Sequence, residues 1–167
     1  MNVETIKPES FLLVPEAKDR EEFSIYPVRV LEGLSWYKTH EMLIQDQLRM
    51  PTTREFTDLV SLVLSKKRLY DYKGDKLSTT KSDKKKIEIS EYLLVPRGEW
   101  MGLHLDAYFA IVNKELSMCS NHIKLPDGRF FPSRVEPLEE HLRENTYSSL
   151  IFNHQGLPTR RSGTQSY

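Results

Sequence analysis

The chain has 167 residues, 38% of them hydrophobic, and its 24 basic side chains balance 24 acidic ones, so the formal net charge is zero. This length favours a single domain, and seven Phe, eight Tyr and two Trp supply a core, which excludes wholesale disorder. Balanced charge excludes a globally basic nucleic-acid binder. No apolar run is long enough to span a membrane and no secretory signal pattern opens the chain, so we expect a cytoplasmic protein.

The N-terminal part predicts two short strands followed by a helix. The apolar runs Phe11–Val14 and Phe23–Val30 are interrupted by prolines, which favours short edge strands. Apolar side chains recur at helical spacing after Ser35, a suitable N-cap, and Pro51 ends this helix.

A second helix follows directly. Thr52 and Glu55 match a capping box, and the apolar stripe behind them predicts a helix to about Tyr70. The tight connection also fits a helix-turn-helix, whose second helix presents basic side chains near its start. Here Glu55 and Asp58 outnumber Arg54, and because two carboxylates repel phosphate we expect a packed helical hairpin instead.

Charge is distributed unevenly along the chain. The net charge is −4 over residues 1–65, +6 over 66–86 and −2 over 87–167. Beyond Tyr72, the basic stretch contains glycine, serine and threonine and a single aliphatic residue, Leu77. Such a composition buries too little apolar area to offset the entropy of ordering, so it predicts a long mobile loop.

The C-terminal half predicts an antiparallel meander. Apolar and polar residues alternate over Ile87–Val95, Glu99–Val112 and Glu115–Leu125, and a fourth strand begins at Arg129. The intervening Pro126–Gly128 is a strong turn signal.

Two further segments follow the meander. Glu136–Arg143, with Pro137 at its first position, predicts a short helix, and the last ten residues have no apolar pattern. The expected fold is one α+β domain, a helical hairpin on a mostly antiparallel β-meander. Its expected parts are the domain 1–157, with helices at about 35–70, the basic loop at about 71–86 and the β-rich part at about 87–135, and then a polar tail at 158–167.

One strand carries a cluster of chemically active side chains. Strand alternation predicts that His104, Asp106 and Tyr108 share one face. The same alternation puts Phe109, with Leu105 and Ala107, on the opposite, buried face. Histidine and aspartate on one face can form a metal site or an acid–base pair.

His122 is the nearest candidate for a third ligand, and the register of the hairpin decides whether it can contribute. If Asn113–Lys114 is a two-residue turn, His122 lies opposite Leu105, away from His104. A three-residue loop puts His122 opposite Asp106. Since Asn-Lys is not a favoured pair for a tight turn, both registers stay open. The competing interpretation is a solvated strand face with one histidine at the edge of the core.

Other catalytic patterns are weaker. The single cysteine, Cys119, pairs with Tyr108 in the two-residue register, with no histidine on that face, which favours a structural thiol and excludes a disulfide framework. None of the seven glycines forms a phosphate-cradling loop, so no cofactor is predicted.

The lysine-rich stretch is the strongest functional feature, as an electrostatic arm for nucleic acid or an acidic protein surface. Tyrosines near its start can stack on exposed bases. The competing interpretation is a solvated surface loop. The candidate binding residues are Lys66, Lys67, Arg68, Tyr70, Tyr72, Lys73, Lys76, Lys81, Lys84, Lys85 and Lys86.

The sequence therefore predicts a non-enzymatic binding or interaction module, with no metal, no cofactor and no membrane contact. The alternative hypothesis is a small metal-dependent hydrolase that uses His104, Asp106 and His122.

Overall fold

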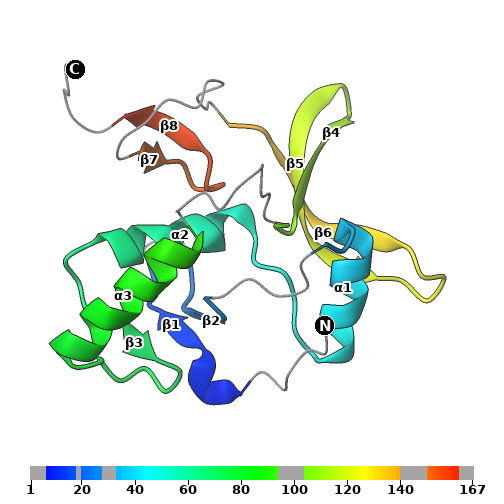
Figure 1. The fold of residues 1–167 in the computed structure, drawn as a ribbon. Helices are drawn as coiled ribbons and strands as arrows, with labels where there is room; N and C mark the ends of the chain where they lie inside the picture. The colour runs from blue at the N-terminus through cyan, green and yellow to red at the C-terminus, as the bar shows by residue number, and fades with distance from the viewer. Residues whose placement is uncertain (1–6, 18–19, 28–32, 94–103, 140–149, 162–167) are drawn as a thin grey trace. The chain divides into compact units, whose positions relative to one another are not determined.

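Figure 1 shows the computed structural model, which describes residues 7–17, 20–27, 33–93, 104–139 and 150–161. These residues form three α-helices and antiparallel sheets, which confirms the predicted α+β class. The chain divides into two compact units. The first unit comprises Met1–Leu48 and Asp58–His104, and the second comprises Arg49–Thr57 and Leu105–Tyr167.

The first unit holds a small antiparallel sheet with strand order β2-β1-β3. Leu12 pairs with Ile25 on one side of β1, and Leu13 pairs with Tyr70 on the other. None of the helices in the described part of the chain has the length and apolarity that a membrane crossing requires. The elements of this unit are the 3-10 turn Pro8–Ser10, β1 (Leu12–Val14), β2 (Phe23–Ile25), α1 (Trp36–Gln45), β3 (Tyr70–Asp71), α3 (Thr79–Leu93) and most of α2 (Thr53–Leu64).

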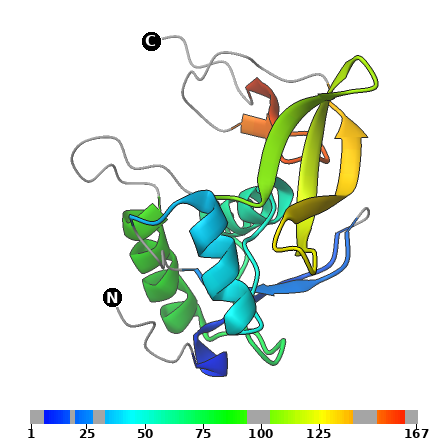
Figure 2. The ribbon, with the colours of Figure 1, turned by 90° about the vertical axis from the view of Figure 1, so that its right-hand side faces the viewer.

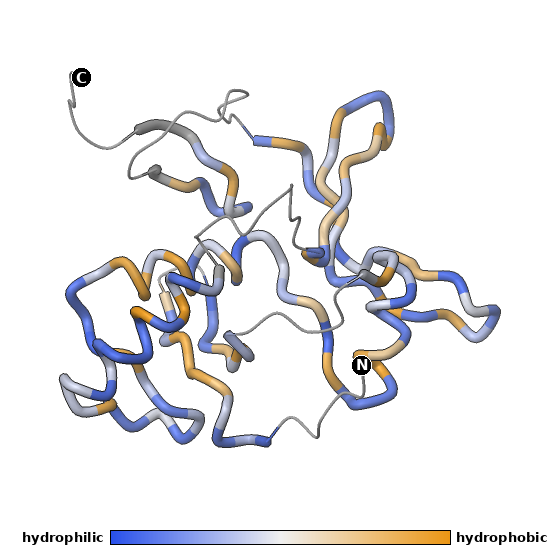
Figure 3. Tube along the Cα trace, in the orientation of Figure 1, coloured by the Kyte–Doolittle hydropathy of each residue, from blue (hydrophilic) through white to orange (hydrophobic). Residues whose placement is uncertain are grey.

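The core of this unit forms between β1, β2, α2 and the segment after α2, and α3 adds Ile89 to it. Figure 3 colours the short strand β1 as hydrophobic and the turn after β3 as mostly hydrophilic, the contrast expected when only the strand is buried. The core residues are Leu12, Val14, Ile25, Leu59, Leu62, Val63, Leu69 and Ile89.

Local capping signals determine where α1 and α2 begin. The Ser35 side chain accepts a hydrogen bond from Lys38 N at 3.3 Å, as predicted for the N-cap. Thr52 and Glu55 form the predicted capping box, with Thr52 N donating to Glu55 Oε2 at 2.8 Å and Glu55 N to Thr52 Oγ1 at 3.3 Å. Both helix starts are confirmed, and the packing of α1 and α2 as a hairpin stays a prediction.

The predicted end of the second helix was wrong. It stops at Leu64 rather than near Tyr70, because Tyr70–Asp71 forms β3 and pairs with β1. Sheet pairing requires extended backbone, so the chain must leave the helix before it reaches this strand.

The predicted basic loop at 71–86 and the predicted strand Ile87–Val95 were also wrong. Helix α3 occupies Thr79–Leu93, and residues 94–95 lie outside the described part of the chain. Ser78 caps this helix, because its carbonyl accepts from Ser82 N at 2.8 Å and its Oγ from Lys81 N at 3.4 Å. Lysine is a good helix former, and a helix that covers a core built by other elements needs few apolar side chains of its own.

Helix α3 is anchored by polar as well as apolar contacts. Ile89 is buried in the core, and the fully buried Ser82 accepts a hydrogen bond from Leu69 N at 3.0 Å. Lys86 Nζ donates to Ser65 O at 2.6 Å and to Lys67 O at 2.5 Å. This lysine therefore holds the backbone that follows α2.

The second unit contains a three-stranded antiparallel sheet with strand order β4-β5-β6. In Figure 2 these strands run side by side, coloured from yellow-green to orange. They are the last three strands of the predicted meander, although Glu99–Val112 shortens to β4, and residues 99–103 lie outside the described part. The strands of this unit are β4 (Ala107–Val112), β5 (Glu115–Lys124), β6 (Phe130–Pro137), β7 (Leu150–Phe152) and β8 (Pro158–Arg161).

Two turns position these strands. Val112 pairs with Glu115 across a two-residue turn, in which Asn113 and Lys114 both have positive φ angles, 51° and 71°. This is the conformation that a tight antiparallel hairpin needs, and it decides the register that the sequence left open. The predicted Pro126–Gly128 turn is also confirmed, with Gly128 at φ 86° and its N donating to Leu125 O at 2.9 Å.

The C-terminal predictions were wrong in part. Glu136 and Pro137 belong to β6 rather than to a helix, and Leu138 N continues the ladder by donating to Leu116 O at 2.8 Å. Residues 140–143 of that predicted helix lie outside the described part. The predicted tail at 158–167 begins with β8, which pairs with β7, and its residues 162–167 also lie outside the described part. The one-domain prediction for residues 1–157 stays a prediction.

Lys86→Met should lower the free energy of unfolding by about 1–2 kcal/mol, because two carbonyls lose a charged hydrogen-bond donor. The matched control Lys84→Met removes the same charge from an exposed position of α3 and should change stability by about 0.5 kcal/mol or less. Urea denaturation followed by circular dichroism measures both, and equal effects would show that Lys86 has no structural role.

Gly156→Ala should be more destabilising than Gly128→Ala, although both glycines have positive φ angles, 80° and 86°. A Cβ at Gly156 would lie 2.6 Å from the Arg54 backbone of α2, whereas nothing lies within 4 Å at Gly128. We expect a cost of about 1–2 kcal/mol from the backbone conformation at each site, and about 1–3 kcal/mol more at Gly156 from overpacking. Equal melting temperatures of the two variants would contradict this contact.

Candidate functional site

The turn after β3 is short and well defined rather than a loose loop. Tyr70 bridges to Lys76, and the chain reverses through Gly74, which has a φ of 87°. Asp71 Oδ1 accepts hydrogen bonds from Lys73 N at 2.9 Å and from Asp75 N at 3.0 Å. Turns are commonly stabilised by an aspartate side chain that accepts hydrogen bonds from backbone N–H groups of the following residues.

Most of the predicted cationic residues are accessible. Lys85 and Lys86 are half-buried, and Lys85 Nζ lies 4.0 Å from Glu88 Oε2 in an ion pair along α3. The exposed cations, which we call the basic surface, are Lys66, Lys67, Arg68, Lys73, Lys76, Lys81 and Lys84.

Each predicted tyrosine of this region has a lysine ammonium over its ring. Lys73 Nζ lies 5.5 Å from the ring centroid of Tyr72, and Lys76 Nζ lies 5.8 Å from that of Tyr70. Both distances are within the range of a cation–π contact. Tyr72 is 38% exposed and Tyr70 is half-buried, so both rings combine an accessible π-system with a nearby positive charge.

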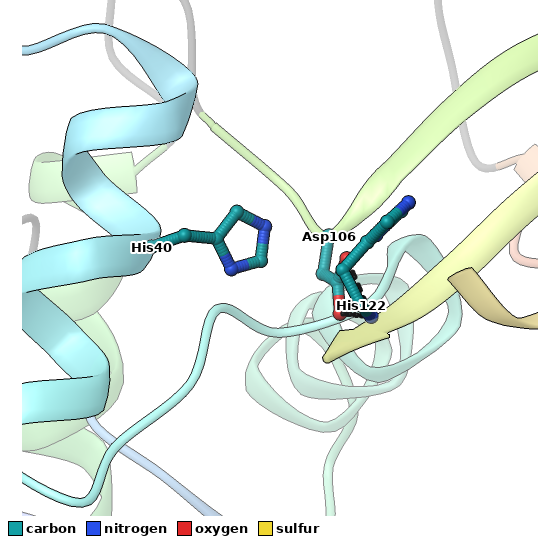
Figure 4. A group of neighbouring side chains, drawn as sticks. All are labelled: His40, Asp106 and His122. Carbon is teal, nitrogen blue, oxygen red and sulfur yellow. Dashed lines mark hydrogen bonds and ion pairs between the residues drawn. The ribbon is translucent and has the colours of Figure 1, made fainter. Parts of the chain in front are cut away.

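A second candidate site lies in the second unit, where Asp106 contacts His122 (Figure 4). Asp106 Oδ2 accepts a hydrogen bond from His122 N at 3.1 Å, and Oδ1 forms a short contact with His122 Nδ1. The ring of Tyr108 lies 5.0 Å from that of His122. Asp106 N donates to Pro51 O at 2.8 Å, which joins the pair to the segment that precedes α2.

Two predictions for this cluster were wrong: the position of His122 in the two-residue register, and the burial of Phe109. The register is that of the two-residue turn, yet His122 still meets Asp106. Asp106 precedes β4, and Asn121 has a φ of 55°, so strict alternation does not hold at this end of the hairpin. In addition, Asp106 is buried while Phe109, predicted to be a core residue, is 55% exposed.

His104 is not part of this pair in the structure. It belongs to the first unit, where its ring is exposed and Nε2 lies 2.9 Å from Leu34 O. His40, which Figure 4 also draws, belongs to the first unit as well. It is a buried residue of α1 whose ring centroid lies 4.1 Å from that of Trp36, and the sequence did not indicate it as a site residue.

Charge near the pair comes from Arg49 and Glu55. Burial acts to raise the pKa of Glu55, but hydrogen bonds from Arg49 and Thr52, together with the Arg49 charge, outweigh it and hold the pKa below its usual value. The hydrogen bond to Glu55 raises the pKa of Arg49 against the effect of burial, and the charges of Glu55 and Asp106 add to this rise. Arg49 therefore stays positive and acts on both carboxylates.

This arrangement suits a structural role better than a catalytic one. The side chain of His122 is 0% exposed and that of Asp106 is 2% exposed, and both are engaged with one another. General acid–base catalysis requires that substrate come within hydrogen-bond reach of the imidazole. Cys119 is likewise buried, and it pairs with Tyr108 as predicted, in keeping with a structural thiol.

Comparison of the chain with protein-family models, with curated proteins and with solved structures gives no match. The chemistry of these two sites is therefore the basis for any functional proposal.

Asp106→Ala should lower the free energy of unfolding by about 2–4 kcal/mol, because the buried backbone N–H and the ring of His122 each lose a hydrogen bond to this side chain. Asp83→Ala, at an exposed position of α3, is the matched control and should cost about 0.5 kcal/mol or less. Chemical denaturation monitored by circular dichroism compares the two. A loss for Asp106→Ala as small as that of the control would contradict the structural role.

Proposed function

We propose that this protein is a non-enzymatic binding module that holds a polyanionic partner, nucleic acid or an acidic protein surface, on its basic surface. The observation that carries the proposal is the exposure of seven cationic side chains on the segment around β3 and the first turns of α3. Residues 66–86 have a net charge of +6 in a chain that is otherwise acidic. Binding should therefore be confined to this region of the first unit.

The segment that carries the basic surface is ordered, which supports the proposed binding. A disordered arm must lose conformational entropy when it binds, whereas here the turn after β3 is fixed by Asp71 and helix α3 is fixed by Ser82 and Lys86. Most of the affinity for a nucleic acid should come from the release of counterions. Engagement of four to six lysines would then give a slope of log affinity against log salt of about −3 to −4 on a single strand.

The metal-dependent hydrolase remains an untested alternative that we do not adopt. Its three residues are divided between the two units, with His104 in the first and Asp106 and His122 in the second. A cytoplasmic location also stays a prediction, and the proposed binding does not depend on it.

The test replaces three exposed cations of the basic surface together, as Lys73→Gln, Lys76→Gln and Lys84→Gln. The matched control removes the same charge elsewhere, as Lys38→Gln, Lys114→Gln and Lys124→Gln. Fluorescence anisotropy measures binding of a labelled single-stranded oligonucleotide and of labelled poly-glutamate over a range of salt concentrations.

The basic-surface variant should bind more weakly, and its salt slope on the oligonucleotide should be flatter by about two, from three lost phosphate contacts. The control should keep the slope of the unmodified protein. Equal effects of the two triple variants, or no binding of either probe at low salt, would refute the proposal.

A further inference from the structure

We infer that the polyanion is a single-stranded nucleic acid whose bases stack on Tyr72 and Tyr70 while its phosphates contact Lys73 and Lys76. This inference rests on the proposed function and names the partner of the same surface. Single-strand binders combine cations that follow the backbone with aromatic rings on which successive bases stack.

The pairing of rings and ammonium groups carries the inference. In both pairs the Nζ lies less than 6 Å from a ring centroid, at 5.5 Å for Lys73 on Tyr72 and 5.8 Å for Lys76 on Tyr70. A nucleotide presents a flat base and a phosphate joined by one sugar, so a ring with an adjacent cation offers a partner to each part. Because Tyr70 and Tyr72 are two positions apart in the chain, the two pairs are suited to neighbouring nucleotides.

The turn that carries these side chains is pre-organised. The Asp71 side chain accepts hydrogen bonds from Lys73 N and Asp75 N, and Asp71 N donates to Asp75 O at 2.9 Å. A Cβ placed on Gly74 would lie 3.4 Å from Leu13 Cδ2, so the turn packs against β1. Binding then orders few residues, which lowers its entropic cost.

The composition of the basic surface favours phosphate over protein carboxylates. Six of its seven cations are lysines, and Arg68 is the one arginine among them. Arginine is enriched and lysine depleted in protein–protein interfaces, where planar bidentate contacts are valuable. Lysine binds phosphate as a point charge, which suits a flexible backbone that is read without sequence preference.

The exposed ring of Tyr72 further favours single strands over duplexes. Bases in a duplex are stacked on one another, and a protein ring can stack only on a base that is unpaired. Tyr72 is 38% exposed, so it can accept a base without rearrangement of the core. A duplex would use the lysines alone.

The experiment compares Tyr72→Leu with Tyr72→Phe, which keeps the ring, and with Tyr37→Leu, which removes another exposed tyrosine of the first unit, on α1. The probes are a labelled 12-nucleotide single strand, a duplex of the same sequence and poly-glutamate of similar charge. Anisotropy gives the affinity and the salt slope for each, and circular dichroism checks that each variant is folded.

We expect tighter binding of the single strand than of the duplex or poly-glutamate. Tyr72→Leu should weaken single-strand binding by about fivefold or more with an unchanged salt slope, the effect of losing one stacked base. Tyr72→Phe and Tyr37→Leu should bind like the unmodified protein.

Two results would overturn the inference, and they are distinguishable. If binding depends on the basic surface but is equal for all three probes, or is unaffected by Tyr72→Leu, stacking is refuted and the proposed function stands. If no probe is bound at low salt, the proposed function fails and the inference fails with it.

Discussion

The structure of the first unit depends on hydrogen bonds between side chains of α3 and the backbone segment that follows α2. The last carbonyls of a helix have no intrahelical donors, and here the chain must pass from Leu64 into β3 within a few residues. Lys86 donates to two of the carbonyls in this stretch, and Ser82 accepts from the N–H of the buried Leu69. Because the buried Leu69 N–H would cost about 1–3 kcal/mol without its acceptor, the connecting segment and α3 order one another.

This arrangement assigns different roles to neighbouring lysines. Lys86 donates hydrogen bonds to backbone carbonyls of the first unit. Lys84, two residues away, is exposed and belongs to the basic surface. The turn after β3 is fixed in the same way, because Asp71 is used for backbone contacts and its negative charge is partly neutralised by two N–H donors. Polar contacts therefore order this segment together with the buried Leu69 and Ile89, and the cations of the basic surface are exposed to a partner.

Hydrogen bonds between buried polar groups also hold elements of the second unit together. Asp106 lies where the chain enters β4, and it contacts both the side chain and the backbone of His122 while its own N–H reaches Pro51. These contacts join the start of β4, the end of β5 and the segment before α2. A buried carboxylate is costly unless donors surround it, and the positive charge of Arg49 adds to their effect.

The sequence by itself determined the features that depend on near neighbours. Ser35 and the Thr52–Glu55 capping box mark two helix starts, and Pro126–Gly128 marks a turn, because each forms its hydrogen bonds within three residues. It also located the basic stretch and the tyrosines at its start. The helical state of α3, the exposure of Phe109 and the meeting of Asp106 with His122 were decided by the tertiary structure. The contacts of α3 and of Asp106 join residues far apart in the chain, and the Asp106–His122 contact also depends on a positive φ at Asn121. Periodicity carries no information about either. A segment poor in aliphatic residues can be a helix when other elements supply most of the core, to which α3 adds only Ile89.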